Sequence, residues 1–392
     1  TLNGQSTTKT YAELLTTNVV KNVTCKNGTT ANWDNTDFSI KLKNIHTPEY
    51  CTIDFTDGYT VTLTANTGTV NPSIVSVGYG GSAKFTVTPN DGFKAVLETN
   101  TCGGTLSGNI YTISNITSNK TCTITFKKNA AVLSSLIKSY ATSHTNGVYN
   151  ENGYRYEGTD PNNYITMEKT DGTKETWRII GLFPDGESGE NVIRVRKVGY
   201  ESAAYDSNST NHWPNTTLYT TLSSTYSTTN YKNTVNYKMY LGGTNNISSY
   251  TSQDLYDMER MLNSKGTAGK TSQSSYGGTS TFTGSVGLMY PSDYGYAVLA
   301  SDCARTTELY NYDGTAACHN NNWLYQGSST WQWLISPNSS YAGNAFGVAT
   351  GGYVSSSGRS VAYSGSFSPV MALKSDVKVT GSGTQSDPYV MN

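Results

Sequence analysis

The six cysteines are the residues of this chain whose side chains are best suited to covalent or metal chemistry, and they fall into three local pairs. The pairs are Cys25 with Cys51, Cys102 with Cys122, and Cys303 with Cys318. No pair has the Cys-x-x-Cys spacing of a zinc site, and the chain has only 4 His to supplement them. We therefore expect three disulfides in an oxidising compartment, each closing a loop of roughly 15 to 27 residues and contributing about 3 kcal/mol.

A nucleophile and a base lie one helical turn apart at Ser135-Leu-Ile-Lys138. This is the Ser-x-x-Lys spacing of serine β-lactamases, but Ser292-Asp-Tyr294 departs from the Ser-Asp-Asn that such enzymes need, and no Lys-Thr-Gly follows. The chain also lacks His-Glu-x-x-His, a Gly-x-Ser-x-Gly elbow and a phosphate-binding loop. We expect Ser135 to be an ordinary helix residue and the protein not to be an enzyme.

The acidic residues are scattered, often beside Gly or Pro, and we interpret them as turn residues. They are Asp54, Asp57, Asp160, Asp185, Glu187, Asp293 and Asp313. Charged residues make up 14% of the chain and its net charge is -1, without the clusters of Lys and Arg that a nucleic-acid partner requires. We expect no nucleic-acid partner, no bound metal and no cofactor.

Residues 338–368 have an unusual composition, dominated by Ser, Gly, Ala, Val and Asn. This segment contains no Lys, Glu, Gln, Met, Trp or Asp. Tyr, Arg and small polar residues on a fixed scaffold are typical of ligand-contact surfaces. The residues expected to form a binding face are Tyr341, Asn344, Tyr353, Arg359, Tyr363 and Phe367. The alternative is a Gly/Ser-rich series of ordinary strands and turns, which excludes the same residue types by composition alone.

If the segment is a binding face, its large side chains must lie exposed together while the flanking residues are buried. Exposed substitutions change stability by no more than about 0.5 kcal/mol, whereas core truncations cost about 2 to 5 kcal/mol. The residues expected in a buried frame are Trp333, Leu334, Val370 and Leu373. The tryptophans at 177, 213, 323, 331 and 333 are also interpreted as core.

An internal repeat lies near the N-terminus. The first copy consists of Phe38 to Ile45 and 51–55. The second copy consists of 111–116 and 122–126, and its sequence matches the first. Each copy is preceded by a Thr-Cys pair. Repeats of this size indicate small β domains in series. We predict a mostly β, multi-domain fold with modules at 1–56 and 57–128, Ig-like or β-grasp-like, followed by an α+β domain at 129–392.

The second copy carries an ordered series of turn and strand motifs. They are Gly80-Gly81-Ser82, Thr88-Pro89, Gly92-Phe93, Tyr111-Thr-Ile and Thr123-Ile-Thr-Phe126. Over about residues 57–128 this series resembles the divergent internalin-type B repeats of bacterial surface proteins. The resemblance implies a spacer or stalk that holds another domain away from the cell.

The C-terminal region contains helix and strand signals in alternation. Apolar residues at 132, 133, 136 and 137 predict a short helix, and further helices are predicted at 216–226 and 252–262. Tyr154–Tyr156 and 164–167 are predicted to pair as a hairpin through the turn Asp160-Pro-Asn-Asn163.

Several local signatures of this region point to one family. They include Gly153-Tyr-Arg-Tyr-Glu-Gly158, Trp177-Arg-Ile-Ile-Gly181, Gly287-Leu-Met-Tyr-Pro-Ser-Asp-Tyr294, Trp333-Leu-Ile-Ser-Pro337 and Ser368-Pro-Val-Met-Ala-Leu373. Together, over about 130–392, they resemble an uncharacterised domain of surface proteins of gut Firmicutes and their phages. The resemblance implies a divergent C-type-lectin fold, distantly similar to formylglycine-generating enzymes, although Cys303 and Cys318 do not match the motif around the reactive thiols of those enzymes.

Residues 338–368 also resemble the variable region of proteins that retroelements diversify, in which mutation reaches a restricted set of residues. Such regions form the ligand face near the end of lectin-fold domains. A lectin-type calcium site would require Glu-Pro-Asn or Trp-Asn-Asp, and neither occurs.

These observations predict a secreted or surface-displayed adhesin that binds a host, bacterial or phage-receptor surface ligand, either protein or glycan. A filament or pilus subunit is the alternative. In that case the stretch from Thr1 to Asn22, with its alternating Thr, Val and Leu, adds a strand to a neighbouring subunit. The same stretch is otherwise a strand or linker of its own module.

Overall fold

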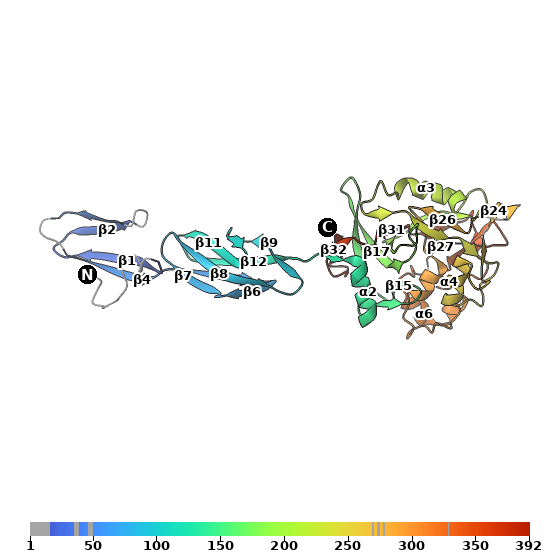
Figure 1. The fold of residues 1–392 in the computed structure, drawn as a ribbon, viewed down its shortest axis with the longest axis horizontal. Coiled ribbons are helices and arrows are strands. Elements are labelled where there is room, and N and C mark those ends of the chain that lie inside the picture. Colours follow the sequence, from blue (N-terminus) through green and yellow to red (C-terminus); the bar gives the residue numbers. More distant parts are fainter. Residues whose placement is uncertain are drawn as a thin grey trace. The chain divides into compact units, whose positions relative to one another are not determined.

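The computed structural model shows two compact units, Thr1–Asn129 and Ala130–Asn392 (Figure 1). Because 44% of residues are in strands and 14% in helices, the protein is mostly β, as the sequence predicts. The structure describes residues 16–34, 39–45, 50–268, 270–272, 275–276, 279–327 and 329–392. Residues 1–15, most of the stretch suggested for self-association, lie outside this range.

The first copy of the repeat forms two two-stranded antiparallel sheets. Its strands are β1 (Asn18–Cys25), β2 (Thr30–Asp34), β3 (Ser39–Lys43) and β4 (Cys51–Asp57). β1 pairs with β4 and β2 pairs with β3. The predicted disulfide joins Cys25 to Cys51, which lie directly opposite each other in the β1–β4 register. Residues 18–20 and 22 therefore pair with β4 of their own module.

The second copy is a sandwich of two four-stranded sheets, ordered β10-β11-β8-β6 and β7-β5-β12-β9. Its strands are β5 (Tyr59–Ala65), β6 (Gly68–Asn71), β7 (Ile74–Val77), β8 (Gly81–Pro89), β9 (Phe93–Asn100), β10 (Thr105–Ser107), β11 (Ile110–Ile116) and β12 (Lys120–Lys128). β9 pairs with β12 and β10 with β11, which repeats the pairing of the first copy.

The two copies differ in how many side chains they bury. In the second copy, alternating apolar side chains such as Phe85, Tyr111 and Phe126 are 0% exposed between the sheets. Among the described residues of the first copy, only Val23 and Thr29 are buried. The second copy thus has a hydrophobic core of its own, whereas the described strands of the first copy do not enclose one.

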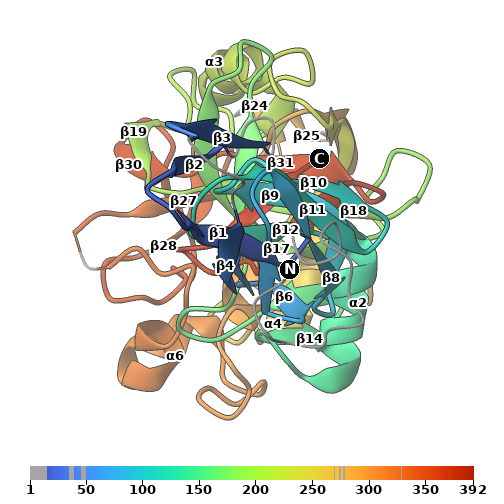
Figure 2. The same cartoon turned by 90° about the vertical axis from the view of Figure 1, so that its left-hand side faces the viewer.

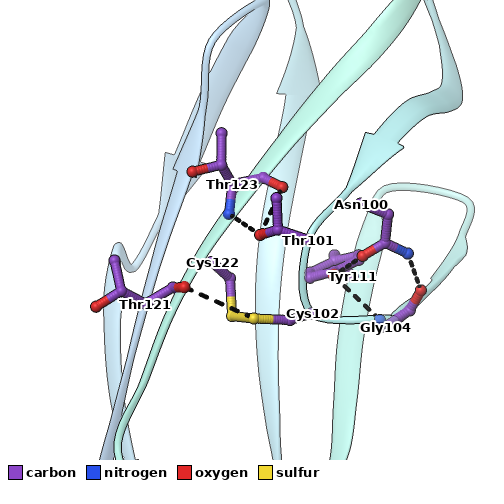
Figure 3. The surroundings of a disulfide bond; sticks show 8 residues. All are labelled: Asn100, Thr101, Cys102, Gly104, Tyr111, Thr121, Cys122 and Thr123. Atoms are coloured by element: carbon purple, nitrogen blue, oxygen red, sulfur yellow. Dashed lines mark hydrogen bonds between the residues drawn. A yellow bond between two sulfur atoms is a disulfide. The ribbon is translucent and has the colours of Figure 1, made fainter.

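The second disulfide, Cys102–Cys122, ties the loop after β9 to β12 (Figure 3). Beside it, the Tyr111 hydroxyl donates to Asn100 Oδ1 and accepts from the Gly104 N–H. A side chain at position 104 would place its Cβ 2.6 Å from the Tyr111 ring, so the close approach requires glycine.

The C-terminal unit is built on one large mixed sheet, ordered β13-β32-β33-β16-β17-β18-β31-β20, with β15 also paired to β17 and β14 to β15. Its strands are β13 (Ala131–Val132), β14 (Val148–Asn150), β15 (Tyr154–Tyr156), β16 (Tyr164–Glu168), β17 (Lys174–Phe183), β18 (Val192–Lys197), β20 (Thr234–Val235), β31 (Val370–Lys374), β32 (Lys378–Thr380) and β33 (Tyr389–Met391). The predicted hairpin is wrong, because β15 and β16 each pair with β17 and not with each other.

A second, five-stranded sheet, ordered β19-β30-β27-β28-β29, carries the unusual C-terminal segment. Its strands are β19 (Glu201–Ala204), β27 (Gln332–Pro337), β28 (Asn344–Val348), β29 (Arg359–Ser360) and β30 (Ser364–Phe367). Figure 2 shows this sheet on one side of the unit and helix α2 (Leu133–Ser143) on the opposite side.

The helices of the C-terminal unit are short. They are α2, α3 (Thr217–Thr225), α4 (Ser252–Arg260), α5 (Pro291–Tyr296) and α6 (Ala316–Asn320), with 3₁₀ turns η1 (Trp213–Asn215) and η2 (Leu309–Gly314). The first three confirm the predicted helices. α4 begins where Thr251 and Asp254 form a capping box, each satisfying a backbone N–H of the other. The third predicted disulfide, Cys303–Cys318, is also present and ends in α6.

Small two-stranded sheets complete the unit. Their strands are β21 (Tyr237–Tyr240) with β26 (Thr281–Gly284), β22 (Gly242–Gly243) with β23 (Thr267–Ala268), and β24 (Lys270–Ser272) with β25 (Ser275–Tyr276). The five tryptophans predicted as core are all buried in this unit, from 0% exposure at Trp177 to 9% at Trp331.

Candidate binding face

The edge of the five-stranded sheet gathers four of the six expected contact residues. β28 pairs with β29 so that Asn344 faces Ser360 and Ala345 faces Arg359. Tyr341 is 51% exposed and Tyr363 60%, Arg359 is exposed, and Asn344 is half-buried. We call Tyr341, Asn344, Arg359 and Tyr363 the binding face.

Arg359 contacts aromatic rings rather than an acid. Its guanidinium carbon lies 5.1 Å from the ring centre of Tyr363 and 5.8 Å from that of Trp331. Within the described part of the chain, it forms no ion pair with a carboxylate. Such contacts contribute about 0.5–1 kcal/mol at exposed sites, and they leave the hydrogen-bond donors of Arg359 available to a ligand.

Two tryptophans support the binding face from within. The rings of Trp331 and Trp333 meet edge-on at 5.7 Å. A Cβ at Gly347 would lie 2.3 Å from Trp331, and one at Gly365 would lie 2.6 Å from Trp333. These glycines allow both indoles to lie against neighbouring strands, so the sheet beneath Arg359 is closely packed.

Buried asparagines fix the loop that presents Tyr341. Asn211, which is 0% exposed, donates to the backbone carbonyls of Asn338, Tyr341 and Asn344 at 2.7, 3.1 and 2.7 Å. Asn338 Oδ1 in turn accepts from the N–H groups of Ser340 and Tyr341, both at 2.9 Å. The loop is therefore ordered without a ligand. Sequence reasoning missed Asn211, since no local pattern links it to a loop that begins 127 residues later.

Tyr353 lies apart from the binding face. It follows the far end of β28, a five-residue strand that spans about 16 Å. Its ring meets the edge of Tyr310 at 5.7 Å, and it is half-buried against the core. The structure therefore does not bring Tyr353 together with the other expected contact residues.

Phe367 is the one expected contact residue that the structure buries. It is 3% exposed, because it is the last residue of β30 and packs into the core. Its assignment to the binding face is wrong. The expected frame is confirmed, since Trp333, Leu334, Val370 and Leu373 are all at most 1% exposed.

A buried ion-pair network lies deeper in the unit. Arg155 and Arg194 both donate to Asp293 at 2.8 Å, and the Phe183 ring lies 4.7 Å from the first guanidinium carbon and 3.8 Å from the second. Burial raises the pKa of Asp293, but the facing charges of Arg194 and Arg155 outweigh it, so the pKa lies below its ordinary value.

The network extends to Asp185, Arg260 and Glu259. Arg260 lies 3.4 Å from both acids, and the Ser292 N–H and hydroxyl donate to Glu259 at 2.7 and 2.5 Å. Burial raises the pKa of Glu259 to about 7. Because Asp185, Glu259 and Asp293 are at most 2% exposed, we assign the network to the core. Interpreting Asp293 as a turn residue was wrong, because it lies in α5, whereas Asp185 does lie in the connection between β17 and β18.

Other candidate chemistry lies elsewhere. Ser135 and Lys138 are both exposed on α2. Among the residues that the structure describes, no group of three or more His, Cys, Asp or Glu is placed to hold a metal ion. In the same residues, no helix has both the length and the apolar character needed to cross a membrane.

No protein-family model, curated protein or solved structure matches this chain.

Proposed function

We propose that the protein is an extracellular or surface-displayed binding protein whose C-terminal unit recognises a surface ligand through the binding face. The observation that carries this proposal is the contrast within residues 338–368. Tyr341, Arg359 and Tyr363 are exposed, while the backbone that presents them is held by buried Asn211 and Asn338.

A pre-ordered loop favours binding because little conformational entropy is lost when the ligand arrives. Tyr and Arg supply large contact areas, hydrogen-bond donors and stacking surfaces, and both are enriched among residues that dominate binding energy. Three disulfides support an oxidising, extracellular setting. In this proposal, the N-terminal β modules act as a spacer.

The proposal includes the lectin-like character of the C-terminal unit and the diversification of residues 338–368. Exposed Tyr341 and Tyr363 beside a buried frame support diversification, because their substitution leaves the core intact. The test is genomic: a template repeat matching the codons of this segment, beside a reverse transcriptase gene, is expected. A locus without both elements would contradict diversification but not binding.

Binding is tested with the full chain on arrays of glycans and on intact bacterial and host cells. The variant Tyr341→Ala/Arg359→Ala/Tyr363→Ala should bind at least about tenfold more weakly, because Tyr and Arg are enriched among the few interface residues whose truncation costs about 2 kcal/mol or more. The control is Tyr200→Ala, which removes a tyrosine of the same unit that is 51% exposed but lies outside the binding face. If the triple variant binds as well as the control, the binding face is wrongly assigned.

A further inference from the structure

A second concave site lies at the other end of β28, beside Tyr353 and separate from the binding face. It is a cavity of 520 Å³, within the range of about 300–1,000 Å³ for small-molecule sites. Its lining includes Asp313, His319, Asn320, Tyr325, Thr350 and Gly351. None of the four binding-face residues lines it, so the two sites can be tested independently.

His319, which lines this cavity, carries a hydrogen-bond acceptor that the described residues do not use. Its Nδ1 lies 2.9 Å from the backbone carbonyl oxygen of Tyr312. A carbonyl only accepts, so Nδ1 must carry the proton, and in the neutral ring Nε2 is left with its lone pair. Nε2 has no hydrogen-bond partner among the described residues.

The position of His319 is fixed on several sides. Gly352 has φ +82°, and a Cβ there would lie 2.4 Å from the Cβ of His319, so the backbone packs directly on the side chain. The Tyr294 hydroxyl holds the Gly352 carbonyl at 2.6 Å. The adjacent residue Cys318 is tied to Cys303. The imidazole therefore keeps its orientation without a ligand.

The remaining lining complements His319. The Asp313 carboxylate accepts hydrogen bonds, and the Asn320 amide both donates and accepts. Tyr325 bonds its hydroxyl to the Thr350 carbonyl at 2.6 Å and contacts the imidazole edge-on at 5.4 Å, so its ring is a fixed wall.

The charge of the lining excludes two ligand classes. The lining named above holds no Lys or Arg, so it offers nothing to offset a phosphate or sulfate. One carboxylate, Asp313, is too few for a calcium ion, which takes six to eight oxygen ligands. The lining is complementary to a ligand with several hydroxyl groups, which donate to Asp313 and His319, and an apolar face, which packs on the Tyr325 ring.

We infer that this cavity binds one sugar residue: a neutral, hydroxyl-rich ring held by Asp313, the Nε2 of His319 and Asn320 against Tyr325. The site is additional to the binding face, and it would recognise the end of a glycan chain or a free monosaccharide.

Saturation-transfer NMR on the full chain tests the inference with four probes, the methyl glycosides of glucose, galactose, mannose and N-acetylglucosamine. At least one glycoside should bind. His319→Asn keeps a donor for the Tyr312 carbonyl but removes the acceptor in the cavity, and Asp313→Asn removes the carboxylate. Each should weaken binding at least about tenfold, as expected for a hydrogen bond to a well-placed or charged group. Asp376→Asn, an exposed acid outside the cavity, should leave binding unchanged.

Three results would overturn the inference: no glycoside binds; both cavity variants bind as the wild type does; or sodium sulfate or tetramethylammonium chloride binds in a His319- and Asp313-dependent manner while the glycosides do not. The Tyr341→Ala/Arg359→Ala/Tyr363→Ala variant should retain glycoside binding. This separates failure of the cavity from failure of the binding face.

Discussion

The C-terminal unit places arginine in two opposite environments. Arg155 and Arg194 are at most 2% exposed and share Asp293, whereas Arg359 is exposed and contacts only aromatic rings among the described residues. The buried pair has lost its hydration and depends on the acid for compensation. Arg359 keeps its hydration and depends on no single partner. The arginines that pair in the core and the arginine that we propose contacts a ligand are therefore different residues of one unit, so each can change without the other.

The largest expected effect tests the buried side of this comparison. Asp293→Asn removes the acid that faces Arg155 and leaves Arg194 with only Asp185, 3.3 Å from its Nε, so it should lower the free energy of unfolding by about 3–5 kcal/mol. Chemical denaturation measures it. The matched control is Asp160→Asn, whose carboxylate pairs with Arg178 but is 63% exposed, and which should cost at most about 1 kcal/mol. Equal losses in the two variants would show that burial does not distinguish these arginines.

Two aromatic residues four positions apart extend the contrast to apolar packing. Phe367→Ala removes a 3% exposed ring and should cost about 3–5 kcal/mol. Tyr363→Ala removes a 60% exposed ring and should change stability by no more than about 0.5 kcal/mol. Thermal and denaturant unfolding of both variants measures the difference. A stable Phe367→Ala variant would restore that residue to the list of contact candidates.

The pH dependence of stability should separate Glu259 from surface acids. Its pKa is about 7 in the folded protein, above the ordinary value of 4.5, so the folded state holds a proton that the unfolded state releases. The contribution is fully present below about pH 4.5 and is lost as the pH rises to about 7.

The Glu259→Gln variant lacks the stabilisation that protonation of Glu259 provides. Its free energy of unfolding relative to that of the wild type should therefore increase as the pH rises from about 4.5 to about 7. Denaturation curves at several pH values measure the trend, with the exposed Glu187→Gln as control. A constant difference between Glu259→Gln and wild type across the interval would show that Glu259 is ionised throughout.

Arg359→Lys should have the smallest effect on stability, within about 0.5 kcal/mol, because the side chain is exposed. It keeps the positive charge but loses the planar group that stacks on Tyr363 and forms two parallel hydrogen bonds. Ligand binding should therefore weaken although unfolding does not change. Unchanged binding would indicate that charge alone is recognised.

Local features of the chain were predictable from the sequence, and long-range ones were not. The three disulfides join cysteines only 26, 20 and 15 residues apart, and each pair was evident from its spacing. α4 was evident from its apolar periodicity. The hairpin prediction failed because β15 and β16 pair one after the other along the same edge of β17, and pairing of this kind leaves no local pattern.

Contacts between residues far apart in the sequence also explain why some site residues were predicted wrongly. Asp293 looks like a turn residue because the arginines that it faces lie 138 and 99 residues earlier in the chain. Arginines inside apolar strand sequences, as in Tyr154-Arg-Tyr156, favour buried acids as partners but do not indicate which ones. Phe367 looks exposed because the Ser and Gly around it suggest a loop, whereas they form β30.

The clamp formed by Asn211 has a consequence for protein engineering. Its amide contacts only main-chain carbonyls, and every amino acid supplies that group, so the clamp is indifferent to which side chains the loop carries. The shape of the loop thus depends on Asn211 and Asn338 rather than on the exposed side chains that the loop carries. A display library randomised at Tyr341, Asn344, Arg359 and Tyr363, with Asn211 and Asn338 kept, would vary the chemistry of the surface while its architecture is inherited unchanged.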